Sequence, residues 1–333
     1  MTFKRTSEGD VEMAKAKTNT YSEKNGFLYE LYKNKVLFIM MLPATIILLI
    51  NNYLPMAGVL IAFKNYQYKG RNVFENFFLS EWVGFKNFEF LFNTPDAYTI
   101  TRNTILYNVA FIVVGLVLAV GFAIVLNELS AKKLSKVYQS SMLFPYFLSW
   151  TIVMYLVFAF LSEESGFFNR TLLPALGLEP KMWYLDGKLW PFILVFVYLW
   201  KSVGYNCVVY LAAIAGIDGE YYEAATIDGA TKWQQITRIT LPLLSPLITI
   251  LTLLSIGRIF YADFGLFFNV TKNAGALYDY TNVIDLYVYN GLRNLGDVGM
   301  SSAAGLYQAS LGFIFVLGSN LLVRKLDPEK SLF

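Results

Sequence analysis

Histidine is absent from this 333-residue chain, and cysteine occurs once, as Cys207. The absence of histidine removes the commonest general base and metal ligand near neutral pH. A single cysteine excludes a disulfide within the chain. The sequence also contains no nucleotide-binding P-loop pattern, so any ATP chemistry must be supplied by another polypeptide. We therefore expect this chain to have no catalytic residue, no metal site and no cofactor of its own.

Charged residues are scarce as well. They make up 15% of the chain, whereas soluble domains contain about 25%. Hydrophobic residues account for 56%, and the mean hydropathy is +0.46. A soluble fold could not bury this much apolar surface, so the class is a polytopic protein in contact with membrane lipid. The net charge of +3 is too small to suggest a nucleic acid partner.

Long runs without charged residues recur along the chain. Each is long enough for the ~20 residues that a membrane-spanning helix requires, with the run 239–257 continuing past Arg258 and the run 189–217 interrupted by Lys201. The sequence therefore predicts an all-α, multi-pass protein with six transmembrane helices, which places both termini on the same side. The six runs are 36–63, 103–127, 137–162, 189–217, 239–257 and 298–323.

Basic residues indicate the orientation of these spans. Lys132, Lys133 and Lys136 lie in a short loop, and Arg324 and Lys325 follow the last run. The positive-inside rule places both groups in the cytoplasm. We expect cytoplasmic tails at 1–35 and 325–333 and three outward segments, 64–102, 162–188 and 263–297, of which the first and last carry short surface helices.

A polar stretch, Glu223–Pro242, lies between two apolar runs. We predict one short helix over Tyr221–Ile227, with Asp218 as its N-cap, and a second from about Thr231 to Arg238. Gly229 allows a turn that other residues resist. Pro242 ends this unit or begins the next span. A helical hairpin that projects from a membrane is suited to binding a protein outside the bilayer.

The hairpin resembles a known family. Glu223-Ala224-Ala225, Gly229 and Leu241-Pro242 resemble the EAA loop of ABC-importer permeases. Asp228-Gly229-Ala230 and Trp233 are similar to the version found in maltose-permease-like sugar permeases, although Ile236 stands where that version usually has Phe. Arg102-Asn103-Thr104 and Asn127-Glu128-Leu129 resemble a sugar-permease core. Phe144–Trp150, Trp200-Lys201 and Tyr210–Ile214 are similar to the LplB-like subgroup, which serves complex oligosaccharides including uronate-containing ones.

The resemblance implies a type I ABC importer permease fold in the cell membrane. Its implied partners are a second homologous permease, two ATPase subunits that bind ATP and Mg, and an extracytoplasmic solute-binding protein. It also implies a first helix and external loop at 36–98 and a five-helix core at 99–324, with the coupling hairpin at 218–242. Implied coupling residues are Glu223 (a polar contact to the ATPase), Ala224 and Ala225 (close packing), Asp228, Gly229 (the bend), Trp233 (packing onto the membrane domain) and Pro242.

Two cations lie inside the predicted spans, Lys201 and Arg258, and no acidic residue does. An unpaired cation at mid-span costs about 2.5–3.5 kcal/mol on insertion scales. Water in a cavity, a partner's carboxylate, helix C-terminal carbonyls or the substrate could offset that cost. Helical spacing groups Tyr198, Lys201 and Tyr205 on one face and Ser255 and Arg258 on another. We predict these five as substrate-pathway residues, and leave open a structural Lys201 and an Arg258 that reaches outward to Asp263.

The predicted function is that of a permease subunit of an oligosaccharide importer, forming half of the pathway. The two cations favour an acidic, uronate-containing substrate, because charges attract more strongly in low dielectric. An ABC permease for another solute and a self-sufficient secondary carrier remain alternatives. A proton-coupled carrier is disfavoured, since the spans contain neither carboxylate nor histidine. A membrane scaffold without transport is also disfavoured, because it gains nothing from intramembrane cations.

Overall fold

The computed structural model describes residues 27–89, 91, 94–129 and 131–328. Most of the predicted N-terminal tail and residues 329–333 of the predicted C-terminal tail fall outside this range. The chain divides into two compact units, Met1–Gly58 and Val59–Phe333. The described part of the first unit is helical, with α2 (Phe27–Lys33), α3 (Lys35–Leu48), a π-helical turn at Leu49–Tyr53, and α4 (Leu54–Met56).

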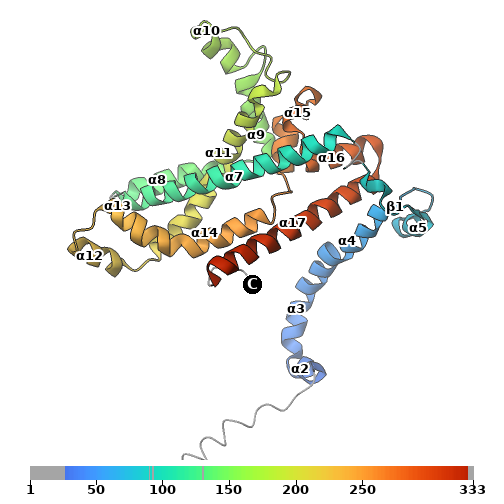
Figure 1. The fold of residues 1–333 in the computed structure, drawn as a ribbon, viewed down its shortest axis with the longest axis horizontal. Coiled ribbons are helices and arrows are strands. Elements are labelled where there is room, and N and C mark those ends of the chain that lie inside the picture. The colour runs from blue at the N-terminus through green and yellow to red at the C-terminus, as the bar shows by residue number, and fades with distance from the viewer. Residues whose placement is uncertain (1–26, 90, 92–93, 130, 329–333) are drawn as a thin grey trace, which may run out of the picture. The chain divides into compact units, whose positions relative to one another are not determined.

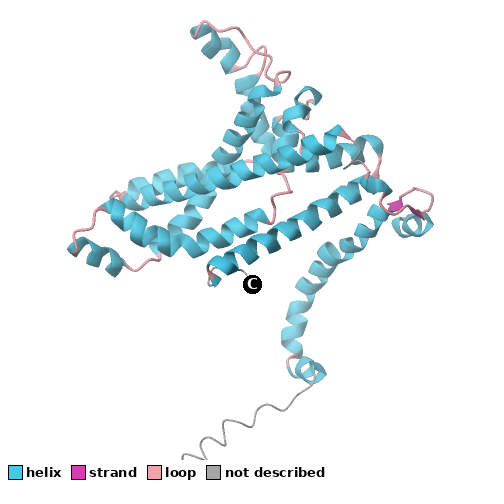
Figure 2. Ribbon diagram, viewed as in Figure 1, coloured by secondary structure: helices cyan, strands magenta, loops and turns pink. Residues whose placement is uncertain are grey.

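The second unit is built from long helices (Figures 1 and 2). Two of them, α7 (Pro95–Glu128) and α11 (Trp190–Ala215), pack along each other. The others are α8 (Lys132–Leu143), α9 (Trp150–Leu161), α14 (Leu241–Ile256) and α17 (Val298–Leu326). Shorter helices connect these: α5 (Val73–Leu79), α10 (Leu173–Ala175), α12 (Gly219–Ile227), α13 (Lys232–Gln235), α15 (Tyr278–Thr281) and α16 (Ile284–Asn290).

The prediction of an all-α fold is confirmed. In the described ranges the only β structure is a two-residue antiparallel pairing of β1 (Lys64–Asn65) with β2 (Glu81–Trp82). The remaining short turns are 3₁₀-helical at Ala57–Phe63, Lys86–Phe88, Phe144–Phe147, Gly187–Leu189 and Gly275–Leu277, and π-helical at Phe168–Leu172, Ile236–Thr240, Leu266–Val270 and Gly291–Leu295. As expected, the segments 64–102 and 263–297, which we predicted to face outward, carry short helices in their described residues.

Five described helices are long and apolar enough to cross a membrane, and a bent pair supplies the sixth predicted span. The five are Lys35–Phe63, Pro95–Glu128, Gly187–Ala215, Lys232–Ile256 and Val298–Lys325. The pair, Lys133–Phe147 and Trp150–Leu161, is bent by 100°. Leu148 and Ser149 are extended there, and Ser149 caps α9 by accepting a hydrogen bond from the Ile152 N–H. The run 137–162 is therefore one apolar stretch but not one straight helix.

The two helices predicted for the hairpin have different bounds in the structure. The first helix begins at Gly219, directly after its N-cap Asp218. The second does not end near Arg238: α13 continues through the π-helical turn Ile236–Thr240 into α14, so Lys232–Ile256 forms one helical span. Pro242 therefore lies within this continuous span, directly after the π-helical turn and Leu241, and has no N–H to donate to the preceding turn.

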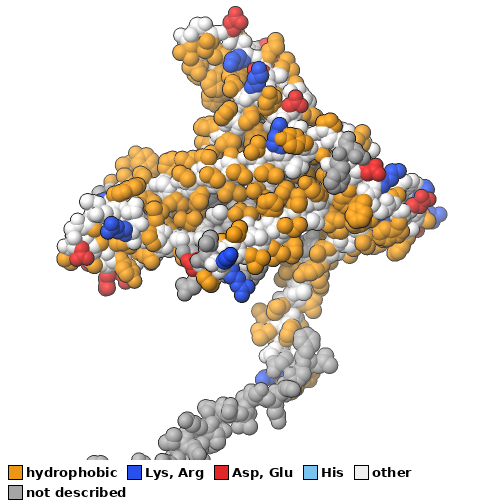
Figure 3. Space-filling view, in the orientation of Figure 1, with side chains coloured by type: hydrophobic (Ala, Val, Ile, Leu, Met, Phe, Trp, Pro, Cys, Tyr) orange, Lys and Arg blue, Asp and Glu red, His pale blue; other side chains and the backbone are white. Residues whose placement is uncertain are grey.

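Apolar side chains pack into three buried clusters. One lies around Trp190, Leu194 and Phe267. A second joins Ile100 to Phe260 and Ala303, and a third joins α7, α11 and α14 around Ala119, Cys207 and Leu244. Apolar side chains also cover the middle of the visible surface of the second unit, while charged ones gather towards its extremities (Figure 3). This distribution suits helices surrounded by lipid.

Candidate functional site

The α12–α13 hairpin is formed by local hydrogen bonds that its sequence encodes. The Asp218 carboxylate accepts from the Glu220 N–H at 3.0 Å, which caps α12. Gly229 has φ +78°, so the glycine predicted at the bend is needed for its backbone conformation. Thr231 and Gln234 form a capping box, with Thr231 N–H donating to Gln234 Oε1 at 2.7 Å.

Three side-chain contacts hold the hairpin to itself and to the rest of the chain. Gln235, only 3% exposed, donates from Nε2 to Thr226 Oγ1 at 2.9 Å. The hydroxyls of Tyr222 and Thr240 lie 2.9 Å apart. Lys232 Nζ lies 3.1 Å from Glu128 Oε2 at the end of α7. The hairpin is therefore a defined element on the membrane helices and not a loose loop.

The outer surface of the hairpin carries large apolar side chains among its polar ones. Ile227 is 86% exposed and Trp233 is 72% exposed. We expected Trp233 to pack onto the membrane domain, but it is exposed, and the neighbouring Lys232 makes the contact with α7 through Glu128. The remaining predicted coupling residues are also at the surface: Glu223, Ala224, Asp228, Gly229 and Pro242 are exposed, and Ala225 is half-buried.

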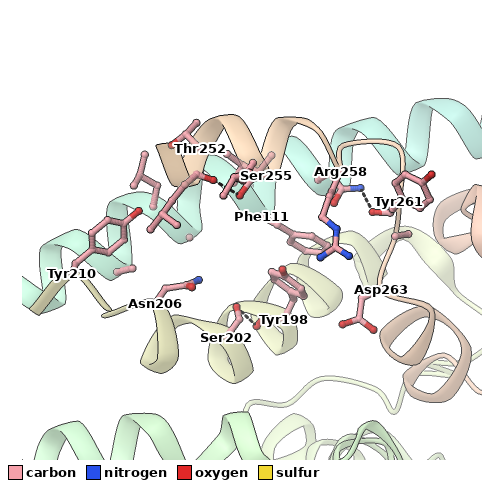
Figure 4. Close-up of a pocket in the computed structure, with 18 of the residues that line it drawn as sticks. Phe111, Tyr198, Ser202, Asn206, Tyr210, Thr252, Ser255, Arg258, Tyr261 and Asp263 are labelled. Carbon is pink, nitrogen blue, oxygen red and sulfur yellow. Dashed lines mark hydrogen bonds between the residues drawn. The ribbon is translucent and has the colours of Figure 1, made fainter. Parts of the chain in front are cut away.

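A cavity of about 700 Å³ lies between α7, α11, α14 and the segment that follows α14 (Figure 4). Three predicted pathway residues, Tyr198, Ser255 and Arg258, line it together. The polar lining residues that the sequence reasoning did not select are Asn108, Ser202, Asn206, Tyr210, Thr252, Tyr261, Asp263 and Asp285.

One helical row explains which residues of α11 face this cavity. Tyr198, Ser202, Asn206 and Tyr210 recur every four residues and all line it, as expected for neighbours on one helix face. This polar i, i+4 pattern was present in the sequence and could have identified Ser202 and Asn206. The sequence analysis instead grouped Tyr198 with Lys201 and Tyr205. Those two residues do not line the cavity.

Lys201 instead contacts the bend between α8 and α9. Its Nζ donates to the Tyr146 carbonyl at 2.7 Å, and it lies 5.4 Å and 5.3 Å from the ring centroids of Tyr146 and Trp150. Tyr205 stacks on Tyr146 at 4.6 Å. A main-chain carbonyl at the end of a helical turn thus compensates the lysine, which is one of the structural alternatives that the sequence left open.

Residues 257–263, which follow α14, do not continue the helix. Polar side chains from α7, α16 and α17 form hydrogen bonds with the backbone of this segment. Asn108 Nδ2 donates to the Tyr261 carbonyl at 3.2 Å. Gln308 Nε2 donates to the Phe260 carbonyl at 2.9 Å. The Asp285 carboxylate accepts from the Ala262 N–H at 2.7 Å and from Gln308 at 3.1 Å. Non-helical backbone is tolerated at membrane depth where it is enclosed by protein or lines a cavity.

The fold brings two carboxylates to the Arg258 end of the cavity. Burial raises the pKa of Asp263, while hydrogen bonds from the Leu266 N–H and the Trp150 indole and the charge of Lys201 act in the opposite direction. Burial likewise raises the pKa of Asp285, opposed by the Ala262 N–H and Gln308. Although no acidic residue lies in the predicted spans, two carboxyl groups, those of Asp263 and Asp285, therefore line the cavity together with Arg258.

The described residues contain no group of three or more His, Cys, Asp or Glu side chains that could hold a metal ion. The cavity instead offers hydroxyl, amide and aromatic groups. Phe111 and Tyr198 stack on each other at 3.8 Å between centroids. Such a surface binds and orients a polar solute without reacting with it.

Comparison with known proteins identifies the wider family. Residues 115–328 match the binding-protein-dependent transport system inner membrane component family. The chain is 32% identical over 299 residues to protein LplB of Bacillus subtilis (strain 168), which covers 90% of this chain and 92% of that protein. It is 31% identical over 328 residues to the polygalacturonan/rhamnogalacturonan transport system permease protein YteP of the same strain, covering 98% and 99%.

A solved structure shows the same arrangement of helices. The chain matches a chain of a bacterial ABC transporter involved in the import of the acidic polysaccharide alginate, with a TM-score of 0.80 and 30% identity over 90% of this chain and 98% of that one. The predicted resemblance to ABC-importer permeases, including the LplB-like subgroup, is confirmed. The chain belongs to the binding-protein-dependent transport system inner membrane component family, and is a multi-pass membrane permease.

Proposed function

We propose that the chain is one of two homologous permease subunits of an ATP-driven importer, and that its substrate is an oligosaccharide. The cavity is the observation that supports an oligosaccharide as the substrate, because stacked aromatic rings lie there beside hydroxyl and amide side chains. A sugar ring is apolar on its faces and polar at its edges, so tyrosine and phenylalanine faces with flanking hydrogen-bonding groups are complementary to it. The volume of about 700 Å³ is within the usual range of ligand pockets.

The relatives support an acidic oligosaccharide. One is a polygalacturonan/rhamnogalacturonan permease, and the structural relative imports alginate, an acidic polysaccharide. That alginate transporter has also been solved with a periplasmic protein that holds an alginate pentasaccharide. By analogy, an extracytoplasmic binding protein delivers a uronate-containing fragment to this permease.

Coupling to ATP is assigned to the α12–α13 hairpin. Its exposed carboxylate, small residues and apolar side chains, with Glu223, Ala224 and Ile227 among them, offer a surface for an ATPase subunit. ATP and Mg bind to that subunit and not to this chain. The hairpin and both termini then face the cytoplasm. The importer core spans 99–324, preceded by the first helix and external loop at 36–98.

Reconstitution tests this proposal. The permease, its partner permease, the ATPase and the binding protein encoded with them are placed in liposomes, and uptake of labelled uronate oligosaccharides is followed with and without ATP. We expect uptake only with ATP and binding protein. Uptake down a gradient without ATP would indicate a self-sufficient carrier, and ATP-driven uptake of a non-saccharide alone would indicate a permease for another solute.

A further inference from the structure

Arg258 is the only cation among the cavity-lining residues, all of which the structure describes. Its side chain extends into the cavity toward Tyr198, with Asp263 beside it (Figure 4). Within the described part of the chain, no hydrogen bond or salt bridge engages its guanidinium. A guanidinium presents several donors in a planar fork that matches a carboxylate.

The other charged groups of the cavity are already engaged. Asp285 accepts from the Ala262 N–H and Gln308. Asp263 accepts from the Leu266 N–H and the Trp150 indole. Arg258 is therefore the charged group left free to bind an incoming solute.

The backbone that carries Arg258 is fixed in place. The carbonyls of Phe260 and Tyr261, two and three residues further along, accept hydrogen bonds from Gln308 and Asn108. Gln308 is only 4% exposed. These contacts fix the backbone that presents Arg258 beside the Phe111–Tyr198 stack before any solute enters, which reduces the backbone entropy lost on binding.

We propose that Arg258 determines substrate charge specificity by binding one carboxylate of a uronate unit whose ring lies against the aromatic pair. This inference rests on the proposed oligosaccharide transport. It goes beyond that proposal by assigning the discrimination between acidic and neutral sugars to a single side chain. Lys201, the other intramembrane cation, has no part in that discrimination because its ammonium is bonded to the Tyr146 carbonyl outside the cavity lining.

The test replaces each of the two intramembrane cations by glutamine, so that the same charge is removed inside the cavity at Arg258 and outside it at Lys201. The reconstituted importer, with its binding protein, is assayed with a uronate trisaccharide and with the same trisaccharide after reduction of its carboxyl groups. We expect Arg258→Gln to lower kcat/KM for the acidic sugar about tenfold or more, the range for losing a hydrogen bond to a charged group. Uptake of the reduced sugar should change by no more than about twofold, since its hydroxyls depend little on the guanidinium charge. Lys201→Gln, which removes the same charge elsewhere, should lower both alike.

Each other outcome is decisive. Equal losses for both sugars in Arg258→Gln, or no loss for the acidic one, would overturn the assignment to Arg258 while leaving oligosaccharide transport intact. The assignment to Arg258 would also be overturned if the wild type took up the reduced sugar but not the acidic one. If the wild type takes only the acidic sugar, Arg258→Lys decides: partial recovery relative to Arg258→Gln supports the proposal, and none contradicts it. If the wild type takes up neither sugar but imports another solute, the proposed function itself fails.

Discussion

The Lys201 side chain carries a charge in a span without contributing to the cavity. Its ammonium donates a hydrogen bond to the Tyr146 carbonyl at the 100° bend between α8 and α9, and lies 5.3 Å from the centroid of the Trp150 ring at the start of α9. The residue thus links α11 to the bend. Its role is positional, and a positional role predicts a loss of stability rather than of selectivity.

We expect Lys201→Met to lower the free energy of unfolding by about 0.5–1.5 kcal/mol, because the hydrogen bond from Lys201 Nζ to the Tyr146 carbonyl is lost. Thermal unfolding of the purified permease complex in detergent measures this as a lower midpoint. Lys201→Arg keeps a donor and serves as the control. An unchanged midpoint in Lys201→Met would show that the bond contributes nothing to holding the bend.

Gly229 is the residue on which the shape of the hairpin depends. A side chain added there would meet no atom within 4 Å, so only its φ of +78° resists substitution. A β-branched residue is strongly disfavoured in this region, whereas asparagine tolerates it.

Gly229→Val should therefore abolish most substrate-stimulated ATPase activity of the reconstituted complex, while Gly229→Asn retains it. Membrane insertion and assembly of both variants are checked by co-purification with the ATPase. Full stimulation in the valine variant would show that hairpin shape is not needed for coupling.

At the scale of elements, α11 passes very close to the end of α8. A Cβ at Gly204 would lie 1.8 Å from the Met142 carbonyl oxygen, a backbone atom that cannot simply rotate away. Gly121, within α7, has nothing within 4 Å of the same position. The two glycines lie in neighbouring helices, but only one of them is required for helix packing.

We predict that Gly204→Ala separates α11 from α8 and lowers the thermal midpoint and the yield of folded permease. Gly121→Ala should leave both unchanged or slightly raised, because alanine favours a helix over glycine by roughly 0.5–1 kcal/mol. Size-exclusion profiles and melting curves of the two variants are compared directly. Equal behaviour would contradict the close approach of α11 and α8.

At the scale of the whole molecule, the predicted orientation of the chain in the membrane can be measured by labelling single cysteines. We predict that a cysteine at Lys136 is shielded from an impermeant thiol reagent in intact cells, whereas one at Glu164 is labelled. Both positions are exposed, while Ser135, next to Lys136 in α8, is buried and unsuitable. Cys207 is first replaced by serine. Labelling at position 136 without labelling at 164 would mean that the chain is inverted.

The sequence by itself determined the features that depend on local physics. Hydropathy located the spans, because each must match the thickness of a bilayer whatever its neighbours are. The hairpin followed from Asp218, Gly229 and Thr231, whose capping and turn roles are set within a few residues. These residues and the motifs around them were also enough to indicate the permease family.

Only the tertiary structure decided which side chains meet. Tyr198 and Lys201 are three residues apart, yet the rotation of α11 sends one into the cavity and the other to a carbonyl 55 residues earlier in the chain. Asp285 reaches the segment after α14 across a separation of 23 residues. Contacts between such distant parts of the chain depend on the packing of all neighbouring helices at once, and no local pattern in the sequence records them, although the polar i, i+4 row of α11 does mark the face that lines the cavity.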